Sequence, residues 1–380
     1  MRLHEVFQQP KTIISEAARI QHAEDIIFWE GSAGAKRALD ALRSMAERGH
    51  EAVTIKWDGS PAIIFGRDQQ GNFILTDKSG FTAKGYDGRS TSGDELEQML
   101  LNRSGGKNRD NPGYVAFAQR MKQIFPLYEA AVPEDYQGFF KGDLLWFTTP
   151  ELQGENYVFK PNVVEYAVDK NSDLGKRIGA STSGVVIHRE IAPDGSEQPL
   201  ENPEIFQGTD VLVLPPVSVE KPADVDHPEL DRLEQLISKN ASAIDAFLNP
   251  VTLKAGKITD LPQLFYAYTN SKVDTGMSNL GADFLKWLEQ RPRISEQKKQ
   301  NVQVYIQEHS QAYQVLWQTI QAIMKVKDHI IAQFDAHSSQ VKQSIGGETG
   351  GEGYVLAHPE GDIKLVPREF FTRANRAQER

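Results

Sequence analysis

Two kinds of hydrophobic spacing divide this 380-residue chain into blocks. Apolar residues recur every three or four positions over residues 12–50, 93–137 and 228–341, which predicts amphipathic helices there. A break at Glu30-Gly31-Ser32 separates two helices in the first block, and a polar loop over residues 104–112 interrupts the second.

The remaining blocks are short runs of β-branched and aromatic residues, which predict strands. These runs cover residues 53–56, 62–66, 72–76, 138–147, 157–168, 184–188, 210–220, 354–358 and 363–368. Asp58-Gly59 between the first two runs predicts a tight hairpin turn. Because strands and helices are grouped and do not alternate one by one, the sequence predicts an α+β fold with mainly antiparallel sheets.

The same blocks predict how the chain is organised into domains. Residues 1–50 form a helical segment that packs on a β-rich domain, and this domain begins with residues 51–220 and is completed by residues 346–380. Residues 221–345 form an all-helical insertion between its two parts. The aromatic residues of the insertion recur at helical spacing, which favours a core role over a binding surface.

Composition narrows the partners. With 42 Lys and Arg against 52 Asp and Glu, the net charge of −10 gives no overall attraction for nucleic acid, so RNA or DNA ends would need a local basic groove. The chain has no cysteine, which excludes disulfides and thiolate metal sites and fits a reducing cytoplasm. No apolar run approaches the roughly 20 residues of a membrane span, so we expect no membrane partner.

Lys56 is the first residue that points to chemistry. It stands at the end of an apolar strand. Burying an ammonium there costs roughly several kcal/mol unless the group is paired or loses its proton. A neutral lysine amine is a nucleophile. Two carboxylates next to glycines, Asp143 and Glu352, and a second lysine among apolar residues, Lys364, have similarly unusual positions. For Asp143, a turn residue and a charge aimed into a cleft are equally good interpretations.

Two other polar segments have simpler interpretations. His22-Ala23-Glu24-Asp25 combines three polar side chains that could orient a ligand, although helix caps and surface turns have this composition more often. Lys78 and Lys84 lie among small and hydroxyl residues that could hold phosphate, and a solvated loop is the more frequent explanation.

Together, a lysine nucleophile, two carboxylates and further lysines fit covalent nucleotidyl transfer. The Lys56 amine would attack the α-phosphate of a nucleoside triphosphate, forming a lysyl phosphoramidate and releasing pyrophosphate. Carboxylates would hold Mg²⁺, and the other lysines would offset the charge on the α-phosphate.

Four segments carry a resemblance to the covalent nucleotidyltransferase superfamily of DNA ligases, RNA ligases and mRNA capping enzymes. Lys56-Trp57-Asp58-Gly59 resembles its Lys-x-Asp-Gly motif, and Phe140-Lys141-Gly142-Asp143-Leu144-Leu145 resembles its Asp-Gly-Glu-Leu segment. Glu352-Gly353-Tyr354-Val355 is similar to its Glu-Gly-x-Val strand, and Ile363-Lys364-Leu365-Val366 to its terminal Lys-x-Lys strand. The order along the chain also agrees.

The resemblance implies a ligase-like domain, here without a barrel after the last motif. It implies that Lys56 becomes adenylated, that Asp143 and Glu352 bind ribose and Mg²⁺, and that Lys364 contacts the α-phosphate. The rest of the implied nucleotide site consists of Thr54, Ile55, Trp57, Asp58, Gly59, Arg67 and Lys84. Arg67 substitutes there for an arginine that the family has where this chain has Pro61.

The expected function is therefore ATP-dependent formation of lysyl-AMP, with ligation of RNA or DNA ends favoured. One alternative is an enzyme that adenylylates a protein or small molecule, which the acidic balance favours. Another is a non-catalytic protein that keeps the fold, favoured by Pro61 and by Val366 in place of a second lysine. Over nearly its full length the chain is also similar to proteins of large tailed bacteriophages; this resemblance implies a host-cytoplasmic location but does not point to any particular activity.

Overall fold

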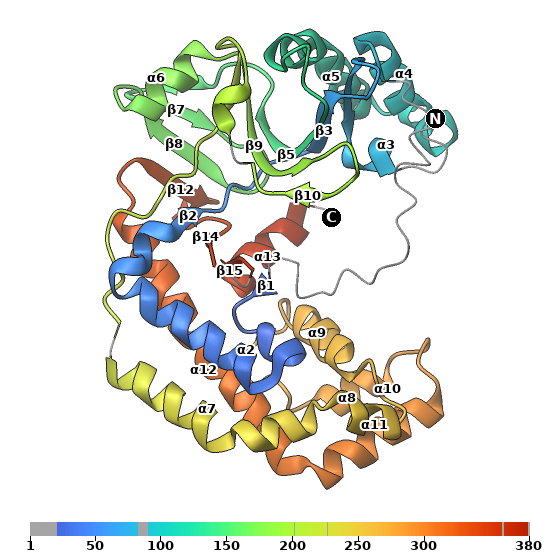
Figure 1. The fold of residues 1–380 in the computed structure, drawn as a ribbon, viewed down its shortest axis with the longest axis vertical. Coiled ribbons are helices and arrows are strands. Elements are labelled where there is room, and N and C mark those ends of the chain that lie inside the picture. Colours follow the sequence, from blue (N-terminus) through green and yellow to red (C-terminus); the bar gives the residue numbers. More distant parts are fainter. Residues whose placement is uncertain (1–20, 83–89, 201, 226, 359–360, 379–380) are drawn as a thin grey trace. The chain divides into compact units, whose positions relative to one another are not determined.

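The computed structural model describes residues 21–82, 90–200, 202–225, 227–358 and 361–378 (Figure 1). It has a mixed α+β fold with mainly antiparallel sheets, as the sequence predicts. Contacts divide the described residues into two compact units. We call residues 57–216 and 340–347 the strand-rich unit, and residues 21–56, 217–339 and 348–378 the helix-rich unit.

The strand-rich unit is built on a sheet with the order β10-β9-β5-β3-β4, to which β11 adds beside β9. Its strands are β3 (Ala62–Arg67), β4 (Phe73–Asp77), β5 (Gly138–Trp146), β9 (Ser183–Ile191), β10 (Glu197–Gln198) and β11 (Val211–Val213). Helices α4 (Gly93–Asn102) and α5 (Pro112–Ala131) cover one face of this sheet. Their Leu96, Leu100, Met121 and Phe125 form one buried core with Phe65, Leu75, Phe140 and Val185 of the strands.

A second sheet has the order β13-β12-β8-β7-β6. Its strands are β6 (Glu151–Gln153), β7 (Asn156–Phe159), β8 (Glu165–Asp169), β12 (Val341–Ile345) and β13 (Glu348–Thr349). The short helices α3 (Lys78–Thr82) and α6 (Asp173–Ala180) follow β4 and β8 in the chain.

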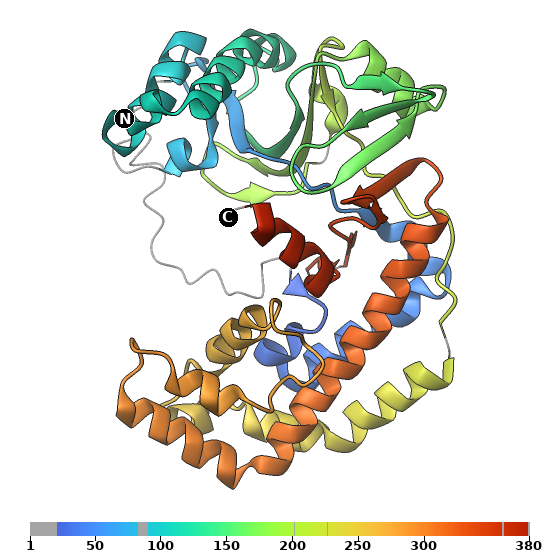
Figure 2. The same ribbon diagram turned by 180° about the vertical axis from the view of Figure 1, so that it is seen from behind.

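The helix-rich unit contains a four-stranded sheet with the order β1-β15-β14-β2. These short strands are β1 (Gln21–His22), β2 (Val53–Ile55), β14 (Tyr354–Leu356) and β15 (Ile363–Leu365). Its helices are α2 (Ile26–Met45), α7 (His227–Phe247), α8 (Pro250–Ala255), α9 (Leu261–Ser271), α10 (Phe284–Glu289), α11 (Glu296–Glu308), α12 (Ser310–His337) and α13 (Arg368–Gln378). Figure 2 shows the long helix α12 running beside α2.

Most of the predicted helices and strands are present, but two predicted arrangements are not. The expected hairpin around Asp58-Gly59 is wrong, because β2 pairs with β14 whereas β3 pairs with β4 and β5 in another sheet. The division into units also differs from the expected domains. The chain crosses from the helix-rich to the strand-rich unit between Lys56 and Trp57, and the last strands group with the helices.

The predicted break in the first helical block is confirmed as a kink, since Gly31 has φ 60° and ψ −138° inside α2. The helix predicted before it lies mostly outside the described residues. In the part of the chain that the structure describes, no helix combines the length and the apolar character that crossing a membrane would need.

Candidate active site

Three of the four resembling segments lie side by side in the sheet of the helix-rich unit. β14, which follows Glu352, pairs antiparallel with β2, which leads into Lys56, and with β15, which carries Lys364. The pairing sets Val355 opposite both Thr54 and Lys364. Segments about 300 residues apart in sequence therefore share one short sheet.

Cross-strand partners lie on the same face of a sheet, and residues alternate between faces along a strand. Val53, Ile55, Leu356, Ile363 and Leu365 face inward and are buried. Thr54, Val355, Lys364 and His22 form a row across the four strands on the other face, because His22 pairs with Lys364. Lys56 follows Thr54 by two residues and therefore lies on the same side of the sheet. We call this side, with Thr54, Val355, Lys364, His22 and Lys56, the open face.

The backbone requires a glycine at position 353, directly after Glu352. A β-carbon at this position would lie 2.0 Å from the backbone oxygen of Leu365, and the residue has φ 121°. The glycine lets β14 approach β15 closely, and its own carbonyl accepts a hydrogen bond from the backbone N–H of Lys56 at 2.9 Å. The turn thereby carries Glu352 to the Lys56 ammonium.

Lys56 and Glu352 form an ion pair in which the lysine Nζ donates to Glu352 Oε1. Their side chains are 23% and 15% exposed, so the pair is accessible from solvent and not locked in the core. Of the two states that the sequence allows for Lys56, paired or deprotonated, the structure shows the paired one.

The Lys364 ammonium differs from that of Lys56. Among the described residues it has no hydrogen-bond acceptor or ion-pair partner. Burial lowers the pKa of Lys364, and the neighbouring Lys56 lowers it further. A partly buried cation without a partner favours binding of an anion.

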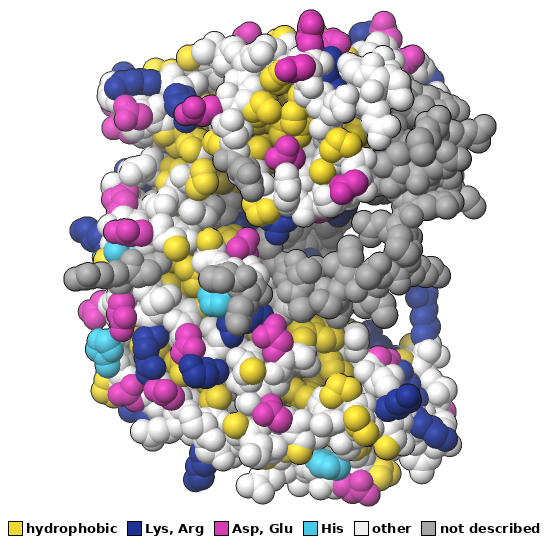
Figure 3. All heavy atoms as spheres, in the orientation of Figure 1, with side chains coloured by type: hydrophobic (Ala, Val, Ile, Leu, Met, Phe, Trp, Pro, Cys, Tyr) yellow, Lys and Arg dark blue, Asp and Glu magenta, His cyan; other side chains and the backbone are white. Residues whose placement is uncertain are grey.

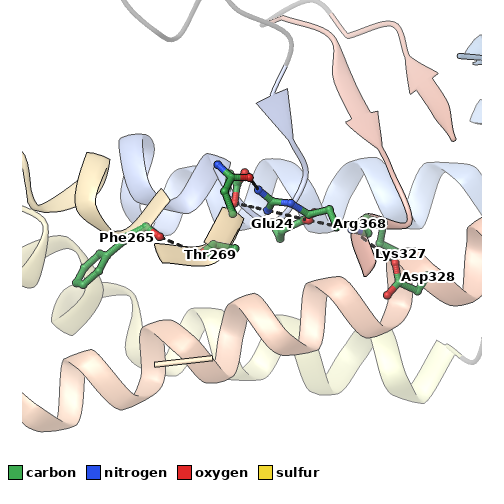
Figure 4. Close-up of polar contacts among 8 residues, drawn as sticks. Glu24, Phe265, Thr269, Lys327, Asp328 and Arg368 are labelled. Carbon is green, nitrogen blue, oxygen red and sulfur yellow. Dashed lines mark hydrogen bonds and ion pairs between the residues drawn. The ribbon is translucent and has the colours of Figure 1, made fainter. Parts of the chain in front are cut away.

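Next to the open face lies a cluster of charged residues that the sequence interpretation placed at the surface. Residues 23–25 form a turn and Asp25 stands at the N-cap position of α2, but its side chain makes no capping hydrogen bond. Glu24 and Asp25 are 0% and 1% exposed, so the predicted surface location is wrong. Lys327 Nζ donates to Glu24 Oε1 at 2.9 Å, and Arg368 Nη1 donates to Asp25 Oδ1 at 2.8 Å and to Glu24 Oε1 at 3.3 Å. Figure 4 shows Glu24 between the two cations. We call these four residues the charged cluster.

The cations of the charged cluster lower the pKa of Glu24 within the cluster and of His22 beside it. Burial alone would raise the pKa of Glu24, but Lys327 and Arg368 outweigh this effect and lower it. Burial and the adjacent cations, Arg368 first among them, lower the pKa of His22 well below its usual value. His22 is therefore neutral at pH 7, and its Nδ1 is buried without a hydrogen-bond partner in the described structure.

In the strand-rich unit, Asp58 of the first motif has a structural environment. It is 5% exposed and accepts hydrogen bonds from the backbone N–H groups of Val163 and Val164, at 2.7 and 2.9 Å, and from Asn162 Nδ2 at 2.8 Å. Its own N–H donates to the Tyr166 hydroxyl at 2.6 Å. Asp58 thus joins the first motif to the segment before β8.

The adjacent Trp57 is also buried. Its ring packs against Tyr166 and Phe159, with centroid distances of 4.7 and 6.3 Å. These contacts hold Trp57 in the core of the strand-rich unit, although its Nε1 is buried without a hydrogen-bond partner among the described residues.

Asp143 lies beside Gly59, where an added β-carbon would come within 2.6 Å of Asp143 Cβ. Asp143 Oδ2 is 2.8 Å from His188 Nε2. Lys141 pairs with Arg189 but Gly142 pairs with Ile187, so His188 is the extra residue of a β-bulge. Bulges redirect side chains, and this one aims His188 at the carboxylate.

Gly142 makes room for the bulge, because a β-carbon there would lie 2.1 Å from Val186 O. The Gly-Asp sequence thus has a backbone reason in addition to any chemical one. Asp143 is 25% exposed and lies within β5, so it is not a turn residue.

Arg67 has a different environment from the one the resemblance implies. Its guanidinium is buried and donates to the backbone oxygens of Pro133, Gly71, Glu129 and Val132. These contacts fasten β3 to the end of α5 and to the turn after β3. Lys84 lies outside the described residues.

A metal site was expected at Asp143 and Glu352. Both carboxylates already have protein partners, His188 and Lys56 respectively. Within the described ranges, no group of three or more His, Asp or Glu side chains is arranged to hold a metal ion. The described residues thus do not form a ready Mg²⁺ site.

The face of the molecule shown in Figure 3 has charges of both signs. On the face shown in Figure 3, Lys and Arg side chains are interspersed with Asp and Glu side chains. This mixture agrees with the net charge of −10.

Sequence reasoning missed several residues of this region. Lys327 was hidden among helical positions, and Arg368 stood at the end of the last predicted strand, only four residues after Lys364. His188 gave no signal, because a bulge is not visible in the hydrophobic pattern. The His22-Ala23-Glu24-Asp25 segment did give a signal, which was outweighed by the frequency of surface turns.

Comparison with known proteins gave one positive result. No curated protein and no solved structure matches this chain. The model of a family of unknown function, DUF6267, matches residues 18–87 and 115–380, which include all four resembling segments. The chain is therefore a member of the DUF6267 family.

Proposed function

We propose that this protein catalyses covalent nucleotidyl transfer through Lys56, with ATP as the donor and RNA or DNA ends as the favoured acceptor. The observation that carries the proposal is the open face, where Lys56 follows β2 and Lys364 lies on β15, on the two sides of the central strand β14, and Glu352, just before β14, is bound to Lys56. The three come from segments that resemble consecutive motifs of one superfamily. Their neighbouring positions in one sheet also support a ligase-like fold.

In the proposed step, the Lys56 Nζ forms a bond to the α-phosphorus while the bond from that phosphorus to the pyrophosphate oxygen breaks. The ammonium must lose a proton before attack, and Glu352 accepts its hydrogen bond and is placed to take that proton. Lys364, without a partner in the described structure, would offset the charge that develops on the α-phosphate.

Asp143 enters the proposal only through the resemblance, as a carboxylate for ribose or metal. Asp143 and His188 are 25% and 37% exposed, so the carboxylate can still be reached by a ligand. Because the described residues form no ready metal site, no step is assigned to Mg²⁺.

The test is to incubate the purified chain with α-labelled ATP and Mg²⁺ and to look for label that survives denaturing electrophoresis. Wild type should retain label, Lys56→Ala should lose it, and both should give the same circular dichroism spectrum. Lys141→Ala is the matched control, because this lysine also pairs with a glutamate, Glu197, on strands of the other unit. Absence of label with every nucleoside triphosphate, or equal label in Lys56→Ala, would refute the proposal.

The acceptor is tested with the labelled protein. Loss of label to a nicked duplex or a 5′-phosphorylated RNA would identify a polynucleotide ligase. The second candidate is adenylylation of a protein or small molecule, which the interspersed surface charges of Figure 3 favour. It predicts that label leaves Lys56 only when such an acceptor is added.

A further inference from the structure

The charged cluster joins four parts of the helix-rich unit. Glu24 and Asp25 stand between β1 and α2, Lys327 lies on α12, and Arg368 begins α13. Arg368 Nη2 also donates to Asn270 Oδ1 on α9 at 2.7 Å. The planar guanidinium therefore contacts two carboxylates from one segment and an amide from another at once.

Such a cluster is a costly way to stabilise a core. All four side chains are at most 2% exposed. Burying each ion costs roughly several kcal/mol of desolvation free energy, and pairing offsets this cost only in part. Apolar residues of similar volume often give equal or greater stability. The cluster is thus better explained by the arrangement it imposes than by stability alone.

That arrangement concerns Lys364. β1 has two residues and β15 has three, so few backbone hydrogen bonds join the two strands. One of these bonds runs from the Ala23 N–H to the Lys364 carbonyl oxygen, at 3.2 Å. Asp25 follows His22 by three residues, and Arg368 follows Lys364 by four. The Asp25–Arg368 pair therefore closes the end of the ladder in which His22 and Lys364 are partners.

We propose that the charged cluster and Asn270 are positioning residues, which hold the Lys364 amine on the open face where an α-phosphate would bind. This inference rests on the proposed function. It gives the helices of residues 228–341 a task, since α9 and α12 supply Asn270 and Lys327.

The test measures the reactivity of the Lys364 amine directly. Competitive acetylation at graded pH, quantified by mass spectrometry, gives the pKa of this lysine without any nucleotide. The charged groups around it are Lys56 from β2, Glu352 before β14, Asp25 before α2 and Arg368 from α13, with His22 neutral.

Asp25→Asn removes a carboxylate that raises the pKa of Lys364, so this pKa should fall below its value in wild type. Unfolding would do the opposite and return it toward the ordinary value of about 10.4. The rate of Lys56 labelling at saturating ATP should fall roughly ten- to a hundredfold, as expected for a misplaced group. The half-saturating ATP concentration should change less.

Asp274→Asn is the matched control, because Asp274 pairs with Arg376 on the same helix α13 but is 40% exposed. It should leave both measurements unchanged. Asn270→Leu is the second variant, since it removes one contact of Arg368 without leaving a buried charge unpaired. It should slow labelling in the same direction but less.

Unchanged Lys364 reactivity and unchanged labelling in folded Asp25→Asn and Asn270→Leu would overturn the inference. If wild type forms no lysyl nucleotide but Asp25→Asn still lowers the pKa of Lys364, the proposed function fails and the positioning of this amine stands.

Discussion

Lys56 and Asp58 are two residues apart, yet their environments are opposite. Asp58 is 5% exposed and its carboxylate accepts three hydrogen bonds, two of them from backbone N–H groups. Lys56 is 23% exposed and has a single carboxylate partner that comes from a distant segment. One motif thus contains a residue that builds the strand-rich unit and a residue that remains available for reaction.

The difference shows how to divide a motif into structural and reactive positions. A polar group whose hydrogen bonds are all satisfied by the protein is costly to redirect toward a ligand, because the groups left behind are buried and unpaired. A group with few protein partners and partial exposure can exchange them at little cost. By this measure Asp58 and Arg67 are structural, and Lys56, Lys364 and Asp143 are available.

The largest expected effect is that of Asp58→Ala. It leaves two buried backbone N–H groups and Asn162 without their acceptor, so the free energy of unfolding should fall by about 3 kcal/mol. Urea denaturation followed by circular dichroism measures the change. Asp58→Asn keeps one acceptor oxygen and should lose less, whereas Lys56→Ala should lose almost nothing. Equal stability of Asp58→Ala and Lys56→Ala would remove the distinction between the two positions.

A smaller loss is expected for Gly142→Ala. The new β-carbon would lie 2.1 Å from the backbone oxygen of Val186, which cannot move aside as a flexible side chain can. The bulge must therefore open, and the free energy of unfolding should fall by about 2 kcal/mol. Gly113→Ala in the first turn of α5 is the control, because its β-carbon meets only Asn111 Oδ1 at 3.3 Å. The acetylation pKa of Lys364, in the helix-rich unit, should not change. A Gly142→Ala protein as stable as the control would show that the bulge tolerates a side chain.

The smallest change in the free energy of unfolding should come from Lys364→Met. This variant should be more stable than wild type, not less stable. Because burial and Lys56 lower the pKa of Lys364, the protonated amine destabilises the folded state at all pH values below that lowered pKa. At pH 7 the variant should gain up to about 1 kcal/mol in free energy of unfolding and lose nucleotide labelling.

The gain of Lys364→Met should disappear as the pH rises toward the unfolded pKa of about 10.4, since the neutral amine is buried at lower cost. Denaturation curves at pH 7 and pH 10 test this sign. A variant that is less stable at pH 7, or that keeps full labelling, would place Lys364 among the structural positions with Asp58.

The sequence predicts the elements well because local periodicity decides them. Alternation locates β14 and β15 and their antiparallel pairing, and helical spacing locates α4, α5 and the helices of residues 228–341. The partner of β2 was mispredicted, because the pattern cannot distinguish a turn from a segment that leaves one sheet for another. The hydrogen bonds of Asp58 to residues 162–164, which direct that segment, link positions more than 100 residues apart.

The candidate site was predictable only in part. Lys56, Glu352 and Lys364 stand out because charged residues at the ends of apolar strands are unusual, and the resemblance connects them. The charged cluster could not be predicted, since each member pairs over about 300 residues or more, as Lys327 does with Glu24. A buried charge is recognisable in sequence only when its partner is local.

The pairing of Asp25 with Arg368 spans 343 positions, and this has a consequence for synthesis of the protein. The ribosome makes β1 and its two acidic residues early, and it makes β15 and Arg368 only after all the helices of residues 228–341. Contacts so distant in sequence form late in folding as well. A nascent chain that already contains Lys56 therefore still lacks Glu352, Lys364 and Arg368, so the open face can form only after residue 368 has been made.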